Sequence, residues 1–190
     1  MRRRTFDSLM TAGGVVSTIV LLVAGALLFV GYNFADSNVR SQLTQQHIIM
    51  PAGPAIADPA IKPYLTKYAG QPMMNGAQAE AYANHFIAVH LTKVAGGKTY
   101  SEVSGLALQN PTDATLQGQV QTLFRGETLR GLLLNAYAFW KVGQIALIAG
   151  IAAFAAAGVM ALLTILGYWH LRKVSPVEEF LAPKEVSRVA

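Results

Sequence analysis

The chain of 190 residues is 53% hydrophobic but only 13% charged. Soluble domains carry about 25% charged residues, so a large share of this chain must avoid water. The absence of cysteine excludes disulfides, c-type haem attachment, iron–sulfur clusters and thiolate zinc sites. The net charge is a modest +5, and the basic cluster Arg2-Arg3-Arg4 is typical of a membrane topology signal, not of nucleic-acid binding.

Residues 9–32 are predicted to form a first transmembrane helix after a short leader, residues 1–8. The segment has no charged residue. A signal peptide is the competing interpretation, because Ala24-Gly25-Ala26 resembles a cleavage site. The apolar run nevertheless exceeds the usual signal core of about 7–15 residues, so we favour an uncleaved signal anchor. The arginines before it predict a cytoplasmic N-terminus.

Residues 33–143 are predicted to form an extracytoplasmic α-helical domain, because no alternating β-branched runs occur there. Residues 36–47 have helical spacing and should extend the first membrane helix. Four prolines in residues 50–63 predict an extended loop that packs on the domain through its apolar side chains. Residues 64–69 should then make a short helical turn, closed by a glycine and a proline.

The next predicted helix runs from Gly76 to about Ala95, with Asn75 as its N-cap. Its apolar residues recur every three or four positions and predict one buried face. That face consists of Ala79, Ala83, Phe86, His90 and Val94. A capping box at Thr99–Glu102 should precede a helix over residues 103–108. After the break at residues 110–111, Thr112 or Asp113 should cap a helix that runs through Phe124.

Residues 144–169 are predicted to form the second transmembrane helix, because they are uncharged, almost wholly apolar and free of proline. Aromatic residues flank both edges, as is typical of the membrane interface. Arg172-Lys173 then predict a cytoplasmic tail, residues 170–190, so both termini should be cytoplasmic. The more polar segment before the span, residues 124–140, should form one long helix with it, or two nearly coaxial helices.

The histidines do not predict a metal site. His85 and His90 are five residues apart, which is about 140° around an α-helix, so they should not share a ligand. We expect His90 to be a satisfied core histidine, while His85 should lie with Gln78 and Asn84 on a more polar side. No histidine lies within either span, so a bis-histidine haem in the bilayer is also not expected.

Two features are candidates for partner contacts. The first is the group Arg125, Glu127 and Arg130 with Trp140; a local ion pair and docking to a partner or lipid headgroup both remain open. The second is a row of small residues that would let helix backbones approach closely, although plain alanine-rich composition gives the same pattern. It consists of Ala149, Ala153, Ala157 and Ala161. The spans lack charge, so a transporter or pump is not expected.

Three segments carry a resemblance to a known family: YLTKYAG (64–70), EAYANHFIAVHL (80–91) and FRGETLRGLLLNAYAFW (124–140). Over nearly its whole length the chain resembles actinobacterial two-span membrane proteins, which include an accessory subunit of the mycobacterial respiratory supercomplex. The resemblance implies a non-catalytic accessory or assembly subunit in the bacterial plasma membrane.

Its implied partners are lipid and integral membrane subunits of respiratory complexes III and IV, namely cytochrome bcc and an aa3-type cytochrome c oxidase. It implies no cofactor of its own and no nucleic acid. Such families sometimes carry a dioxygenase label, which the histidine spacing does not support. The alternative function is a stand-alone membrane-anchored module that binds an envelope ligand.

Overall fold

The computed structural model describes residues 3–173, and the side chains from Arg4 onward. This part of the chain is helical and has no strand. The described residues divide into two compact units: unit 1 holds residues 3–30 and 146–173, and unit 2 holds residues 31–145. The predicted roles of Arg2 and of the tail beyond residue 173 lie outside the described residues.

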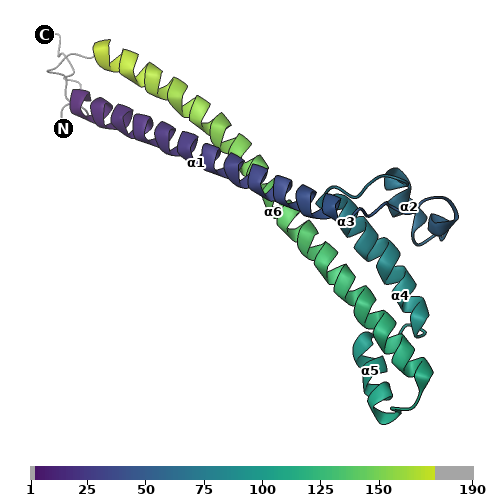
Figure 1. The fold of residues 1–190 in the computed structure, drawn as a ribbon. Helices are drawn as coiled ribbons and strands as arrows, with labels where there is room; N and C mark the ends of the chain where they lie inside the picture. The colour runs from purple at the N-terminus through teal and green to yellow at the C-terminus, as the bar shows by residue number, and fades with distance from the viewer. Residues whose placement is uncertain (1–2, 174–190) are drawn as a thin grey trace, which may run out of the picture. The chain divides into compact units, whose positions relative to one another are not determined.

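Two helices are long and apolar enough to span a membrane: α1 (Arg3–Gln45) and α6 (Ala114–Lys173). Only 6% and 11% of their most apolar windows are buried, whereas the core helix of a soluble protein would be mostly buried. Residues 124–169 are one uninterrupted part of α6 (Figure 1). The prediction of one long helix is therefore confirmed over the alternative of two nearly coaxial helices. The all-α prediction is confirmed for the described residues.

In unit 1, α1 and α6 pack as an antiparallel pair through small residues. A Cβ added to Gly14 would meet the side chain of Thr164, and one on Gly167 would lie 3.3 Å from Thr11 Oγ1. At Gly150 the two backbones lie close together, because an added Cβ would be 3.4 Å from the carbonyl oxygen of Gly25. Small residues permit such contacts in lipid, where helix association depends on packing.

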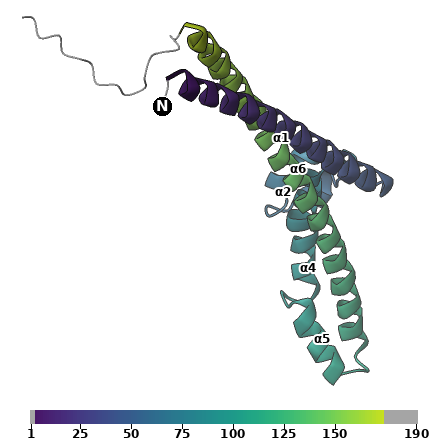
Figure 2. The ribbon, with the colours of Figure 1, turned by 90° about the vertical axis from the view of Figure 1, so that its left-hand side faces the viewer.

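Unit 2 contains shorter helical elements that pack against α1 and α6. In chain order they are the 3₁₀ turn η1 (Gly53–Ile56), α2 (Lys62–Leu65), the 3₁₀ turn η2 (Thr66–Tyr68), α3 (Gly76–Tyr82), the π-helix η3 (Ala83–Ile87), α4 (Ala88–Val94) and α5 (Tyr100–Gln109). Both views show α4 beside α6 (Figures 1 and 2), where Leu91 fills the space over Gly126. Aliphatic side chains from every helix of the unit form the core, with Leu65 and Val103 fully buried.

The predicted helix caps are confirmed. The Asn75 side chain accepts a hydrogen bond of 3.0 Å from the backbone N–H of Gln78 at the start of α3. Thr99 and Glu102 form the complete capping box of α5. Asp113, the second of the two candidates, accepts from the backbone N–H of Thr115 and Leu116 at the start of α6. Each cap satisfies donors that a helix leaves unpaired.

The loop prediction for residues 50–63 is only partly right. The segment packs on unit 2 through buried Met50, Ile56 and Ile61, as expected. It is not extended throughout, because Pro54 sits in the first turn of η1 and Pro63 in the first turn of α2. Proline is compatible with these positions, since the first turn of a helix does not use its missing N–H.

The buried face of the 76–95 helix departs from the prediction at η3. A π-helical turn accommodates one extra residue, so the positions that follow rotate away from the phase of an ideal α-helix. Ile87 and Leu91 are therefore buried where the 3.6-residue period predicted Phe86 and His90. The predicted face holds as far as Ala83 and is wrong by one residue beyond it.

Because the helix face rotates at η3, the prediction that His90 belongs to the core is wrong. Its side chain is exposed, and Nδ1 lies 2.7 Å from the carbonyl oxygen of Phe86, one helical turn earlier. Gln78, which was predicted to lie on a more polar side of the helix, is instead buried. Its side chain accepts a hydrogen bond from the N–H of Met74 and donates one to the carbonyl oxygen of Pro72. The histidine is satisfied, as expected, but at the surface.

Acidic pH should lower the free energy of unfolding of unit 2, because two carboxylates that stabilise it, Asp58 and Glu102, become protonated. Hydrogen bonds from Thr99 lower the pKa of Glu102, and the hydrogen bond from Lys93 lowers that of Asp58. Because both pKa values are lower in the folded state, the stabilisation is present above the unfolded values and is lost as pH falls below about 4 to 5. Urea unfolding between pH 3 and 7 should show this loss, and the double variant Asp58→Asn, Glu102→Gln should show a flatter acid limb. An unchanged acid limb would contradict the assignment.

Candidate functional site

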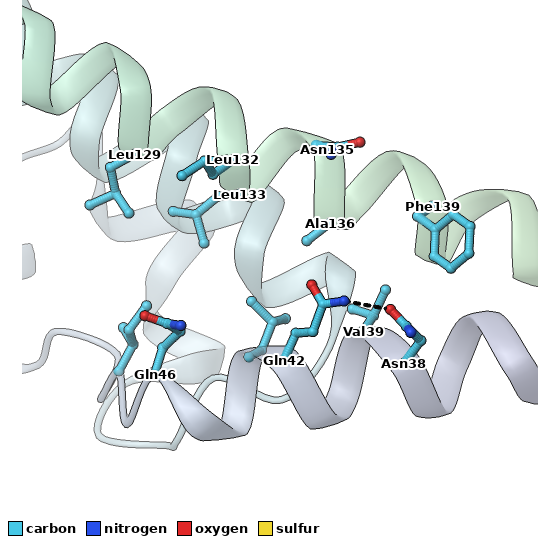
Figure 3. A pocket seen from close by; sticks show the side chains of 12 residues that line it. Asn38, Val39, Gln42, Gln46, Leu129, Leu132, Leu133, Asn135, Ala136 and Phe139 are labelled. Atoms are coloured by element: carbon cyan, nitrogen blue, oxygen red, sulfur yellow. Dashed lines mark hydrogen bonds between the residues drawn. The ribbon is translucent and has the colours of Figure 1, made fainter.

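A groove of about 450 Å³ lies within unit 2, between the C-terminal part of α1 and the adjoining part of α6 (Figure 3). It is partly enclosed and partly open. Its lining residues are Asn38, Val39, Gln42, Leu43, Gln46, Ile48, Leu129, Leu132, Leu133, Asn135, Ala136 and Phe139. None of these side chains is charged. Pockets of this size, largely apolar with a few polar groups, are typical of binding sites.

One side of the groove, called here the carboxamide wall, consists of Asn38 and Gln42 on α1 and of Gln46 in the turn that follows the helix. Asn38 and Gln42 are four residues apart and therefore share a face of α1. They flank Val39 and Leu43, which are buried against the core and hold α1 in this orientation. The Gln42 amide donates a hydrogen bond of 2.7 Å to Asn38 Oδ1, which leaves the Gln42 carbonyl oxygen and the Asn38 amide N–H groups free for an occupant (Figure 3).

The opposite side, called here the apolar wall, consists of Leu129, Leu132 and Phe139 on α6. These side chains are 42%, 63% and 40% exposed. Between the two walls, Leu133 is buried and closes the floor, and Figure 3 shows Leu129 and Ala136 directed toward α1. Single exposed apolar residues are ordinary, but several on one wall of a groove indicate an interaction site.

The charged residues predicted as partner contacts differ in their surroundings: Arg125 is exposed, whereas Arg130 pairs with other side chains of unit 2. Arg125 is exposed and makes no hydrogen bond or ion pair with any other described residue. Arg130 is engaged: it bonds Glu127 at 3.2 Å, the local ion pair that was one of the two interpretations. Its guanidinium also donates to Asn84 Oδ1, and Asn84 donates to Glu80. Arg130 therefore links α6 to η3 and α3.

Trp140 is half-buried and packs on the core of unit 2. Its Cβ lies beside Gly76, the first residue of α3, where an added Cβ would be 2.6 Å away. The ring also lies near Tyr137, with 6.3 Å between centroids. The residue predicted as a partner contact thus has a packing role within the unit.

The alanine row contributes to the helix pair of unit 1. Ala157 is 1% exposed, Ala153 and Ala161 are half-buried, and only Ala149 is exposed. The first three therefore serve contacts within the chain, since this face of α6 meets α1. Of the four predicted positions, Ala149 is the most exposed, and Ala153 and Ala161 keep part of their surface accessible.

His47, His85 and His90 lie on unit 2, whereas His170 lies in unit 1, where its Nε2 is 3.8 Å from Asp7 Oδ2. The His85 ring stacks on Tyr64 at 3.4 Å with an angle of 2° between the planes, and His90 lies against Phe86. Among residues 3–173 there is no group of three or more histidine, aspartate or glutamate side chains that could hold a metal ion. Nearby, burial raises the pKa of Tyr82.

Sequence reasoning missed the groove. Part of its signal was present in the carboxamides at positions 38 and 42, which share one face of a helix beside the apolar pair 39 and 43. Nothing in the sequence indicated that this face and residues 129–139 form opposite walls, because that depends on how α1 packs on α6.

Comparison with protein-family models, curated proteins and solved structures found no match for this chain. On physical grounds alone, residues 3–173 are helical and include two helices that are long and apolar enough to span a membrane.

Proposed function

We propose that this protein is a non-catalytic accessory subunit of an integral membrane complex and that it docks through the groove of unit 2. The observation that carries the proposal is the apolar wall. Leu129, Leu132 and Phe139 are exposed together on one wall of the groove, whereas Leu108, the most exposed leucine of the unit, lies on α5 and does not line the groove. Burying a leucine of this kind against a partner contributes about 1.5–3 kcal/mol, so the wall is a strong docking element.

The membrane assignment rests on composition and packing. Both long helices carry apolar windows that are largely exposed, which suits a lipid environment. In the proposed topology, α1 is an uncleaved anchor, both termini are cytoplasmic and unit 2 is extracytoplasmic, following the positive-inside rule. Gly25, within the competing signal-peptide cleavage site, is buried against α6, which supports retention of the anchor.

The identity of the complex is proposed from the sequence resemblance. The family includes the prokaryotic respiratory supercomplex association factor of mycobacteria, so the proposed partners are subunits of the cytochrome bcc and aa3-type oxidase complexes. Arg125, exposed and unpaired, lies one helical turn before Leu129 and would add an ionic contact at the end of the docking face. No catalytic role is proposed for any residue.

Mild-detergent extraction followed by native gel electrophoresis tests this function. The wild-type chain should migrate with a haem-containing complex. Migration of the chain by itself would contradict the proposal and would favour the stand-alone envelope module.

Leu132→Gln should weaken this association by about tenfold or more, because it replaces the most exposed side chain of the apolar wall with a polar one. Leu108→Gln is the matched control, since Leu108 is 81% exposed on α5 and does not line the groove. The fraction of chain in the complex band measures the effect. Equal retention of the two variants would exclude the groove as the docking site.

A further inference from the structure

The charged residues in the described part of unit 1 all lie at one end of the helix pair. Asp7 is the only acidic residue among them. The basic ones are at the start of α1 and at the end of α6: Arg3, Arg4, Arg172 and Lys173. These two helix ends lie side by side (Figures 1 and 2), with Asp7 Oδ2 at 3.8 Å from His170 Nε2. Both helices therefore contribute charge to the same end of unit 1, called here the basic end.

The single carboxylate of the basic end is turned into the helix pair. The Asp7 side chain is 18% exposed, and its Oδ2 is fully buried. Arg4, Arg172 and Lys173 are exposed. Arg4 precedes Asp7 by three residues and Lys173 follows His170 by three, so both lie about 4.5 Å beyond the Asp7–His170 contact along their helices. The surface of the basic end is therefore cationic on both helices.

Aromatic side chains flank the basic end on α6. Arg172 donates a hydrogen bond of 2.7 Å to the Tyr168 hydroxyl, and its Cζ lies 4.6 Å from the centre of the Tyr168 ring. Tyr168 and Trp169 are 46% and 60% exposed. Exposed tyrosine and tryptophan rings at the end of a membrane span lie at the level of the lipid headgroups. The guanidinium held on Tyr168 keeps further N–H donors, which match the oxygen atoms of a phosphate.

We propose that the basic end binds the phosphate group of an anionic phospholipid, whose acyl chains lie against the exposed apolar faces of α1 and α6. This inference rests on the membrane placement in the proposed function and names a ligand for it. Charge complementarity selects the ligand, because Arg4, Arg172 and Lys173 attract an anionic headgroup. A zwitterionic headgroup also carries a positive charge, which these residues repel.

The apolar surroundings favour a lipid over a soluble anion. Leu166 and Trp169, which lie just before the basic residues of α6, are 57% and 60% exposed. A soluble anion would meet the same positive charges but would leave these side chains uncovered. A phospholipid pairs its phosphate with the basic residues and covers the apolar surface with its acyl chains, so one ligand satisfies both features.

Quenching of Trp169 fluorescence by brominated lipids tests the inference. In the background Trp140→Phe, Trp169 is the only tryptophan of the full chain. The protein is reconstituted in phosphatidylcholine bilayers that contain brominated phosphatidylglycerol or brominated phosphatidylcholine, and the quenching gives the relative binding constant of the two lipids beside Trp169. We expect phosphatidylglycerol to bind about fivefold or more tightly, since one basic residue near the membrane surface contributes about that factor.

The double variant Arg172→Gln, Lys173→Gln should bring this ratio of binding constants close to one. Arg125→Gln, Lys141→Gln is the matched control, because it removes two exposed basic residues of α6 that lie outside the basic end. A ratio near one before these substitutions, or an equal fall in both double variants, would overturn the inference.

The same measurement separates this inference from the membrane placement on which it rests. Equal quenching by the two brominated lipids would show that Trp169 faces lipid and that the inference alone has failed. The absence of quenching by either lipid would refute the membrane placement as well.

Discussion

Gly76→Ala is expected to destabilise unit 2 by about 1–3 kcal/mol. The added Cβ would lie 2.6 Å from Trp140 Cβ and 2.8 Å from Cγ, closer than carbon atoms pack. A change of rotamer cannot relieve the first contact, because the Trp140 Cβ is fixed to the backbone of α6. The start of α3 must therefore move away from α6, and the half-buried indole loses contacts in the core.

Gly105→Ala is the control, and its expected effect has the opposite sign. Gly105 lies within α5, and an added Cβ would meet nothing within 4 Å. Alanine there should stabilise the helix by about 0.5–1 kcal/mol through its higher propensity. Urea unfolding of the full chain measures both, with Trp169→Phe in the background so that Trp140 is the only tryptophan and reports on unit 2. Equal changes in the free energy of unfolding for Gly76→Ala and Gly105→Ala would refute the close contact between Gly76 and Trp140.

Gly150→Leu is expected to disrupt the helix pair of unit 1. The nearest atoms to a Cβ at this position are the carbonyl oxygen of Gly25 and the Cβ of Leu28, both at 3.4 Å, and the backbone nitrogen of Phe29 follows at 3.7 Å. Alanine should fit with little strain. The longer leucine side chain would collide with backbone, which cannot turn aside, so α1 and α6 must separate.

Gly158→Leu is the matched control, because Gly158 lies on the same helix and an added Cβ would meet nothing within 4 Å. The chain has no cysteine, so the engineered pair Thr11→Cys, Gly167→Cys can report on the packing. Thr11 Oγ1 lies 3.3 Å from an added Gly167 Cβ, a separation suited to a disulfide. Gly150→Leu should slow disulfide formation about tenfold, and Gly158→Leu should not. Equal rates would contradict this packing.

Local chemistry accounts for what the sequence predicted well. Asn75, the Thr99–Glu102 capping box and Asp113 satisfy backbone groups only two or three residues away, so short patterns suffice to find them. The two apolar segments were equally clear, because long uncharged runs have few alternatives to a membrane span.

Features that depend on tertiary packing were not predictable in the same way. The π turn at Ala83–Ile87 has no local signature, yet it moves Ile87 and Leu91 into the core and His90 to the surface. Trp140 looked like an interfacial aromatic until the contact with Gly76 placed it in the core of unit 2. The groove likewise requires residues 38–46 and 129–139, which are far apart in sequence, to form opposite walls.

The proposed role of the protein is that of an accessory subunit bound to a haem-containing membrane complex. Its most direct test is size-exclusion chromatography of the tagged full chain, extracted from its native membranes in mild detergent, with haem absorbance and the amount of chain measured across the peak. The proposed function predicts that haem and chain elute together at a constant ratio. Elution of the chain in a separate peak without haem absorbance would contradict it.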